Sequence, residues 1–266
     1  MFAATDLKSI CEIKELIAMN KTGVVSISFR KYSKEEIAEY TKRAGLDSVE
    51  WGGDVHVPHG DITEAEKAVK ITHGCGLEVA EYGSYYVIGQ SEENLFDKVL
   101  ASALALGTRI IRVWPGMNKP SDTFTTEEYE KYVLDAKRIC ALAKEKNLTV
   151  ALECHPSSLT DEYHTSLKFL SDVGAENLKM MWQPNQHRPL SYNLDSIKAL
   201  LPYIVAVHVF SWERKNRLPL AAKESDWKKY MELLREKDLN YMLELMHDDK
   251  IETLEETAKT LKSWFN

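Results

Sequence analysis

The sequence predicts one (β/α)8 barrel across residues 1–266, and three observations support this fold class. Strand-like and helical patterns alternate with a repeat of about thirty residues, which is the length of one βα unit. Eight such units account for the chain, and barrels of about 250 residues commonly form single domains. An open dinucleotide-binding sheet is disfavoured, because the glycines of Gly74-Cys75-Gly76 lie between a helix and a strand and do not follow a strand.

Capping signals mark the helices in the first half of the chain. An amphipathic pattern at residues 7–19 predicts a helix before the first strand. Ser33 with Glu36, and Thr63 with Glu66, match the capping box, in which a hydroxyl and an acidic side chain satisfy free backbone N–H groups. Apolar periodicity predicts the other elements, which are strands 24–29, 48–51, 78–82 and 108–114, a helix that ends near residue 74, and helices 93–106 and 126–146.

The four strands predicted in the second half each end on a side chain that can bind a divalent cation. A single polar ending has an ordinary explanation, since many strands end where the chain meets water, but four successive endings of this type favour a shared function. In a parallel barrel the carboxyl ends of the strands form the active site, so we expect these side chains to converge. The strands 150–153, 180–183, 205–208 and 241–244 end at Glu153, Gln183, His208 and Glu244, and helices are predicted at 163–173, 194–200, 226–237 and 251–264.

The composition favours a small molecule as the binding partner. The formal net charge of −7 disfavours a nucleic-acid or anionic membrane surface, because phosphate groups are bound by clustered Lys and Arg. No signal-peptide core is seen near Asp6 and Lys8, and no run of about 18 apolar residues predicts a membrane span. The four Cys form no CxxC pair, so neither disulfides nor a cysteine zinc site is indicated. We expect a cytoplasmic protein, and both a monomer and a homo-oligomer remain open.

With the strand ends placed, the chain resembles the xylose isomerase-like TIM-barrel superfamily of sugar (phosphate) isomerases and epimerases, which also contains endonuclease IV. The resemblance rests on residues 45–51 (GLDSVEW), 153–156 (ECHP), 208–210 (HVF) and 243–244 (LE). It implies a metal bound by Glu, Asp, His and Glu from strands five to eight, and here these positions hold Glu153, Gln183, His208 and Glu244.

The implied ligand set is a mixed nitrogen and oxygen site that suits Mn, Mg, Co or Zn. Gln183 stands where the family has an Asp, and its amide oxygen can still bind a cation, although it carries no charge. The resemblance also implies that Glu153 and Glu244 exchange protons with a sugar or sugar-like polyol ketone. A cation on the carbonyl and hydroxyl oxygens would stabilise the resulting enediolate, which gives isomerisation or epimerisation.

Six further residues are candidates for substrate contact. His155 lies two residues beyond Glu153 and faces the same side if the chain stays extended, although a histidine before proline is often structural. Arg214 lies six residues after His208, the spacing of a substrate-binding Arg in related epimerases, but it also fits a solvated charge. The complete set is His155, Gln186, His187, Arg214, Glu50 and Trp114.

Three alternatives to an isomerase or epimerase are considered. A dehydratase would use the same cation and bases to expel a β-hydroxyl group. A barrel that binds carbohydrate without a metal is kept open by Gln183. A nuclease like endonuclease IV would need extra His and Asp ligands for a trinuclear zinc site, and strand four instead ends in Val113-Trp114-Pro115.

Overall fold

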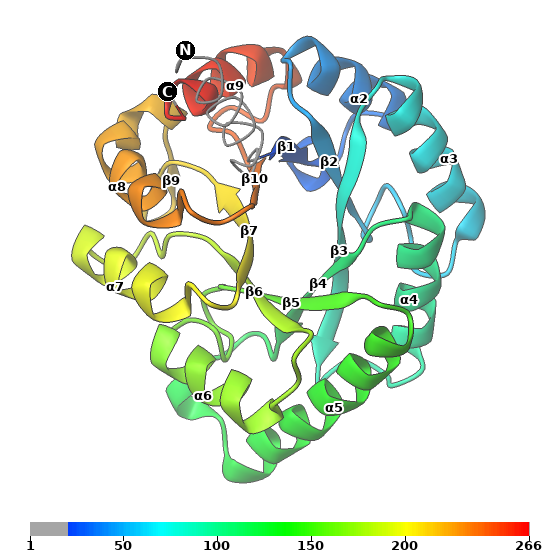
Figure 1. Cartoon of the computed structure of the whole chain (residues 1–266), viewed down its shortest axis with the longest axis vertical. Coiled ribbons are helices and arrows are strands. Elements are labelled where there is room, and N and C mark those ends of the chain that lie inside the picture. Colours follow the sequence, from blue (N-terminus) through cyan, green and yellow to red (C-terminus); the bar gives the residue numbers. More distant parts are fainter. Residues whose placement is uncertain (1–20, 266) are drawn as a thin grey trace, which may run out of the picture.

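Eight parallel strands close into a barrel in the computed structural model of the protein, which describes residues 21–265 (Figure 1). The strands are hydrogen-bonded in the order β1-β10-β7-β6-β5-β4-β3-β2, so each pairs with its neighbour in the chain and the last pairs with the first. This arrangement confirms the predicted (β/α)8 fold. The barrel strands are β1 (Lys21–Val25), β2 (Ser48–Gly52), β3 (Glu78–Ile88), β4 (Ile110–Pro115), β5 (Thr149–Glu153), β6 (Leu178–Trp182), β7 (Ile204–Val209) and β10 (Asn240–Leu243).

The helices lie outside the strands and surround the barrel (Figure 1). The predicted helix at 7–19 lies outside the described residues. Within residues 21–265, no helix is both long enough and apolar enough to cross a membrane. The helices are α2 (Lys34–Arg43), α3 (Ile62–Gly74), α4 (Leu95–Leu106), α5 (Thr126–Glu145), α6 (Tyr163–Val173), α7 (Leu190–Leu200), α8 (Glu224–Leu234) and α9 (Leu254–Ser263).

The start of α3 differs from its prediction. The predicted cap pair was Thr63 with Glu66, but the helix begins after Asp61, whose carboxylate accepts a hydrogen bond from the backbone N–H of Glu64. Asp is a strong N-cap, and Thr63 already lies in the first turn. The capping box of Ser33 and Glu36 is confirmed at α2, and helix α5 begins with a second capping box that the sequence analysis did not identify.

The first strand is also shifted. It was predicted at 24–29, but β1 ends at Val25 and the chain turns into the 3-10 helix η1 (Ser26–Phe29). Two hydroxyls of this turn bind the end of β2 and the loop after β10, since the N–H of Gly52 donates to Ser26 Oγ at 2.8 Å and the N–H of Leu245 donates to Ser28 Oγ at 2.8 Å. The segment therefore does not extend the sheet: Phe29 is buried in the core between strands and helices, and Ile27 packs with Val25 and Met242.

Three loops carry short elements of their own. The connection after β7 forms a two-stranded antiparallel hairpin, and 3-10 turns precede α5, α8 and α9. These elements are the hairpin strands β8 (Trp212–Glu213) and β9 (Asn216–Arg217) and the 3-10 helices η2 (Ser121–Thr123), η3 (Leu220–Lys223) and η4 (Ile251–Thr253).

The barrel has an apolar outer layer and a charged interior. Alternate strand residues such as Val49, Val113 and Trp182 are fully buried in the core that joins the strands to the helices. The intervening residues include Glu50, Arg112 and His208, which are also almost fully buried. Because Glu50 on β2 and His208 on β7 contact each other although their strands are not neighbours, these charged side chains lie inside the barrel.

Candidate active site

Three of the four predicted ligands lie around one ring nitrogen of the fourth, His208. Its Nδ1 atom lies 3.2 Å from Gln183 Oε1, 3.4 Å from Glu244 Oε2 and 3.7 Å from Glu153 Oε1. One ligand atom each from Glu153, His208 and Glu244 can be chosen so that all lie within 4.8 Å of one another. All four side chains are buried. The convergence expected from the strand ends is therefore present in the structure.

The positions of these residues follow from where each strand ends. Glu153 is the last residue of β5, while Gln183 and Glu244 directly follow β6 and β10, so their side chains project from the carboxyl ends of the strands. The prediction had placed Gln183 and Glu244 inside their strands. His208 lies one residue before the end of β7. This edge of a parallel barrel is where active sites are found.

The donor set and the local charge fit a divalent cation. Ligand bonds of about 2 Å require donor atoms that lie within a few ångströms of one another, as they do here. Burial and the nearby charge of Glu50 raise the pKa of Glu81 to about 8, so this carboxyl is largely protonated at neutral pH. The interior then holds three carboxylates and Arg112. With His208 neutral, as a metal ligand must be, two negative charges are left for a dication to balance.

Arg112 is a part of the site that the sequence analysis missed. It lies in β4, is buried, and places its Nη1 atom 3.0 Å from Glu153 Oε2 and its Nε atom 3.6 Å from Glu50 Oε1. Its guanidinium lies 4.4 Å from the centre of the Trp114 ring. A charged residue in the middle of the apolar run Ile110-Ile111-Arg112-Val113 was the available signal, because its neighbours on the same strand face the helices.

The ion pairs hold these groups in their charged forms. Burial alone would raise the pKa of Glu153, but the charges of Arg112 and His208 hold it well below its usual range. Burial alone would lower the pKa of Arg112, and the carboxylates of Glu153 and Glu50 raise it. Burial likewise opposes protonation of His208, yet Glu244 and Glu50 raise the pKa of His208 well above its usual value.

Glu50, a predicted substrate-contact residue, lies within a barrel strand. It belongs to β2, is fully buried, and its Oε2 atom lies 3.0 Å from His208 Nε2. It therefore contacts His208 through the ring nitrogen that faces away from the other candidate ligands. Gly83 makes room for it, because a Cβ atom at this position would collide with the Glu50 carboxylate and lie 2.9 Å from Arg112 Nη2.

Aromatic side chains form a wall beside Glu153. The indole N–H of Trp114 donates to Glu153 Oε2 at 2.7 Å, and the Tyr85 ring meets the Trp114 ring edge to face at 5.0 Å. The His155 ring also contacts Trp114, with ring centres 5.8 Å apart, while its Nδ1 atom lies 2.7 Å from the carbonyl oxygen of Pro156. The structure thus brings two predicted substrate-binding residues, Trp114 and His155, next to a predicted catalytic carboxylate.

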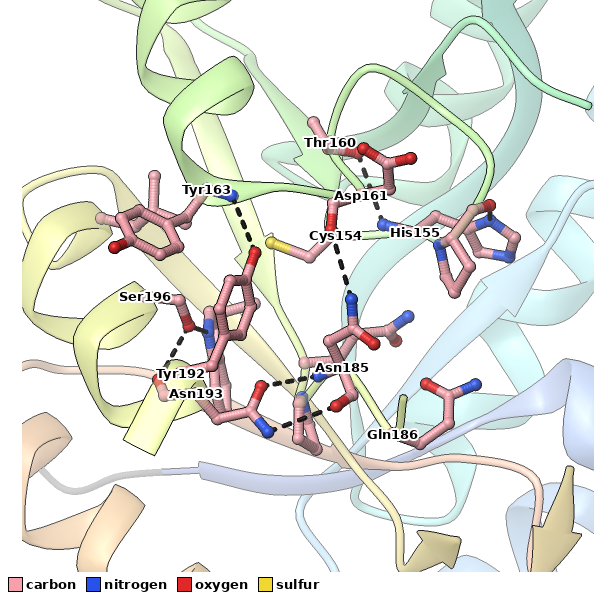
Figure 2. Close-up of a pocket in the computed structure, with 15 residues that line it drawn as sticks. Cys154, His155, Thr160, Asp161, Tyr163, Asn185, Gln186, Tyr192, Asn193 and Ser196 are labelled. Carbon is pink, nitrogen blue, oxygen red and sulfur yellow. Dashed lines mark hydrogen bonds between the residues drawn. The ribbon is translucent and has the colours of Figure 1, made fainter. Parts of the chain in front are cut away.

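A small space borders Cys154 and His155. It lies between the loops after β5 and β6, has a volume of about 20 Å³, and is large enough for about one water molecule. Figure 2 shows the Cys154 sulfur directed toward Tyr192, away from His155. Asn185 ties the two loops together, since its side-chain amide donates to the carbonyl of Asp161 at 3.2 Å (Figure 2).

The other three predicted substrate residues line an open cleft that adjoins this small space, and Gln186 lines both. Gln186, His187 and Arg214 surround a cavity of about 240 Å³ between the loop after β6 and the β8–β9 hairpin. The backbone N–H of Arg214, a residue with a left-handed φ of 55°, donates to the carbonyl of Gln186 at 3.3 Å. Between these three side chains and the four ligand candidates, the described structure shows no hydrogen bond or ion pair.

Comparisons with known proteins identify a matching family model and a similar enzyme. The family model described as xylose isomerase-like TIM barrel matches residues 38–265. A 3-dehydroshikimate dehydratase of Bacillus anthracis is 27% identical over 207 residues, which cover 71% of this chain and 70% of the relative.

Solved structures show the same fold. The probable 3-DHS dehydratase involved in petrobactin synthesis from Bacillus anthracis superimposes with a TM-score of 0.78 at 23% identity, covering 92% of this chain and 99% of that chain. D-Psicose 3-epimerase from Clostridium cellulolyticum H10, with D-tagatose, gives a TM-score of 0.71 at 13% identity, with coverage of 92% and 98%. Since the family model matches nearly the whole described barrel, the chain belongs to the xylose isomerase-like TIM-barrel family.

Proposed function

We propose that the protein is a divalent-cation-dependent dehydratase that removes water from a small polyhydroxylated ketone of the 3-dehydroshikimate type. The observation that carries the proposal is the meeting of Glu153, His208 and Glu244 at the mouth of the barrel. The dehydratase assignment is supported by the 27% identity with a 3-dehydroshikimate dehydratase over 71% of the chain. The isomerase or epimerase expected from the sequence stays a prediction and is the second candidate.

Glu153, His208 and Glu244 would hold the cation, and Gln183 is placed to add its amide oxygen. When bound, a divalent cation supplies a Lewis acid that stabilises negative charge on substrate oxygens. Mg, Mn, Co and Zn are all compatible with two carboxylates, one imidazole and one amide oxygen.

The two carboxylates differ in how tightly the protein holds them. Glu153 Oε2 is engaged by both Arg112 and Trp114, which keep it ionised and fixed. For Glu244, His208 is the one ion-pair partner among residues 21–265. We therefore assign the main proton transfer to Glu244, while Glu153 serves as an anchoring carboxylate and a second proton acceptor.

The proposed step is balanced without an oxidant or reductant. Glu244 takes the proton from the carbon next to the ketone, the electron pair of that C–H bond forms a C=C bond, and the C–O bond of the β-hydroxyl breaks. The proton returns to the departing hydroxyl, which leaves as water. In an epimerase a different proton would be delivered to the same carbon from the opposite face, which requires a second acid–base group in addition to Glu244.

The apolar wall and the open cleft fit a small cyclic or sugar-like substrate. Trp114 and Tyr85 offer aromatic surface beside Glu153, which suits the C–H face of a ring. Gln186, His187 and Arg214 supply polar groups in the neighbouring cleft, where hydroxyl or carboxylate groups would bind.

A reaction screen in deuterium oxide tests the proposal. The protein is loaded with Mn²⁺ or Mg²⁺ and incubated with 3-dehydroshikimate, and in parallel with D-psicose, D-tagatose and D-fructose. Mass spectrometry that shows the loss of one water from 3-dehydroshikimate would support the dehydratase. Deuterium incorporation into a ketose without loss of water would establish the isomerase or epimerase in its place. Binding of a sugar without either reaction would leave the metal-free carbohydrate-binding barrel.

A further inference from the structure

The two ring nitrogens of His208 face different parts of the barrel. Nδ1 faces Gln183, Glu153 and Glu244, whereas Nε2 lies 3.0 Å from Glu50 Oε2. His208 and Glu50 are both fully buried, so water does not compete for the bond between them. A neutral imidazole has one N–H donor and one acceptor nitrogen, and a carboxylate can only accept.

We infer that Glu50 is a positioning residue that keeps the proton of His208 on Nε2 and so presents Nδ1 as the cation ligand. The inference rests on the cation site of the proposed function and adds a residue to it that does not touch the cation. In metal sites the second nitrogen of a ligating histidine commonly donates to a carboxylate or carbonyl, which fixes the tautomer and the orientation of the ring.

The surroundings of Glu50 hold its carboxylate in this place. Arg112 Nε lies 3.6 Å from the other carboxylate oxygen, Oε1. The pairing of β2 with β3 shifts register between Val49 and Trp51, so that β3 has one extra residue opposite Glu50. The irregularity lies on β3, and Gly83 on the same strand leaves space for the Glu50 carboxylate, since a Cβ atom there would collide with Glu50 Oε1.

Glu81 provides a matched control within the same interior. It is a second fully buried Glu, it lies on the neighbouring strand β3, and it bonds to Asn240 Nδ2 at 2.6 Å. The described structure shows no hydrogen bond or ion pair between Glu81 and His208. Replacement of Glu81 therefore removes a buried carboxyl from the barrel without removing the partner of Nε2.

The test compares the wild type with Glu50→Gln and Glu81→Gln. Zn²⁺ and Mn²⁺ affinities are measured by calorimetry, and the ring nitrogens of His208 are observed by ¹⁵N NMR with and without Zn²⁺. The signals are assigned by their loss in His208→Asn. In the wild type we expect Nε2 to keep its proton when Zn²⁺ is added, while the Nδ1 signal moves.

We expect Glu50→Gln to weaken cation binding by roughly 10- to 100-fold, the usual loss when the partner of a ligating histidine is removed. Its Nε2–H signal should also move, because the acceptor has lost its charge. Glu81→Gln should change neither the cation affinity nor the Nε2–H signal. Equal affinities in all three proteins, or a wild type in which Zn²⁺ displaces the proton of Nε2, would overturn the inference.

The outcomes also separate this inference from the proposed function. A wild type that binds neither Zn²⁺ nor Mn²⁺ would refute the cation site itself, and the role of Glu50 with it. A wild type that binds both, with unchanged affinity in Glu50→Gln, would refute only the role of Glu50. If Glu50→Gln does not fold, the wild-type NMR experiment alone still decides which nitrogen keeps its proton.

Discussion

The two halves of the barrel build the site in different ways. Strands β5, β6, β7 and β10 place Glu153, Gln183, His208 and Glu244 at or near their carboxyl ends. Strands β2 and β4 contribute Glu50 and Arg112 from within the strands, and these contact His208 and Glu153 respectively. In the proposed mechanism the second half therefore supplies the groups for chemistry, whereas the buried charges of the first half set their charge and orientation.

Replacement of a candidate ligand carboxylate in the second half should give the largest loss of catalytic activity. Glu153→Gln and Glu244→Gln should each reduce kcat/KM by about 100-fold or more, since each removes a charge from the cation site and a proton acceptor. Steady-state kinetics with the substrate found in the screen measure this loss, and circular dichroism checks the fold. The exposed Glu145→Gln on α5 serves as a control with native activity. Near-native turnover in either variant would contradict the two-carboxylate mechanism.

Removal of the central charge in the first half should mainly affect stability. Arg112→Met leaves Glu153 and Glu50 buried without their cationic partner, which should cost about 3–5 kcal/mol in free energy of unfolding. Urea denaturation at neutral pH measures this loss. Arg43→Met breaks an exposed ion pair with Glu255 and should cost no more than about 1 kcal/mol. Equal losses in the two variants would mean that the interior charges are not coupled as the structure indicates.

Substitution of Gln183 tests whether the residue at this strand end contributes to cation affinity. Gln183→Asp adds a third carboxylate to the ligand set, so Mn²⁺ should bind roughly tenfold more tightly, as expected for one more charge close to the cation. Calorimetric titration of the two proteins measures the change. Unchanged or weaker Mn²⁺ binding would show that the residue at this position is not a ligand. It would favour the alternative of a barrel that binds carbohydrate without a metal.

The smallest effect on cation binding is expected at Glu81, and its signature is a pH dependence of stability. The folded protein keeps the Glu81 proton up to a pKa of about 8, whereas the unfolded chain loses it near the ordinary value of 4.5. Between these values folding takes up a proton, so the contribution of Glu81 to stability falls as pH rises. Glu81→Gln should therefore be more stable than the wild type at about pH 8, with a difference that shrinks toward about pH 5.

Thermal unfolding of the two proteins across this pH range checks the prediction for Glu81. A constant difference between Glu81→Gln and the wild type would show that the carboxyl titrates normally in the folded state. Such a result would also remove the reason for counting Glu81 as neutral in the interior.

Features that depend on one local signal could be predicted from the sequence. A ligand-type residue at the end of each strand predicted that Glu153, Gln183, His208 and Glu244 converge, because the carboxyl ends of parallel strands meet at one edge. Arg112 was not predicted, because its partners Glu50 and Glu153 are distant in sequence and its burial depends on closure of the barrel. The start of α3 was misplaced because Asp61 and Thr63 are both good caps, and local sequence does not decide between them.

The backbone bond between Arg214 and Gln186 has a practical consequence for changing specificity. The loop after β6 and the β8–β9 hairpin are joined through a main-chain N–H and a carbonyl, so the link does not depend on the identity of either side chain. Side chains that line the cleft can then be exchanged without loosening this link and without touching the ion pairs of the barrel interior. On the proposed function, the hairpin and its partner loop are therefore the place to change substrate preference while the buried charged residues stay unchanged.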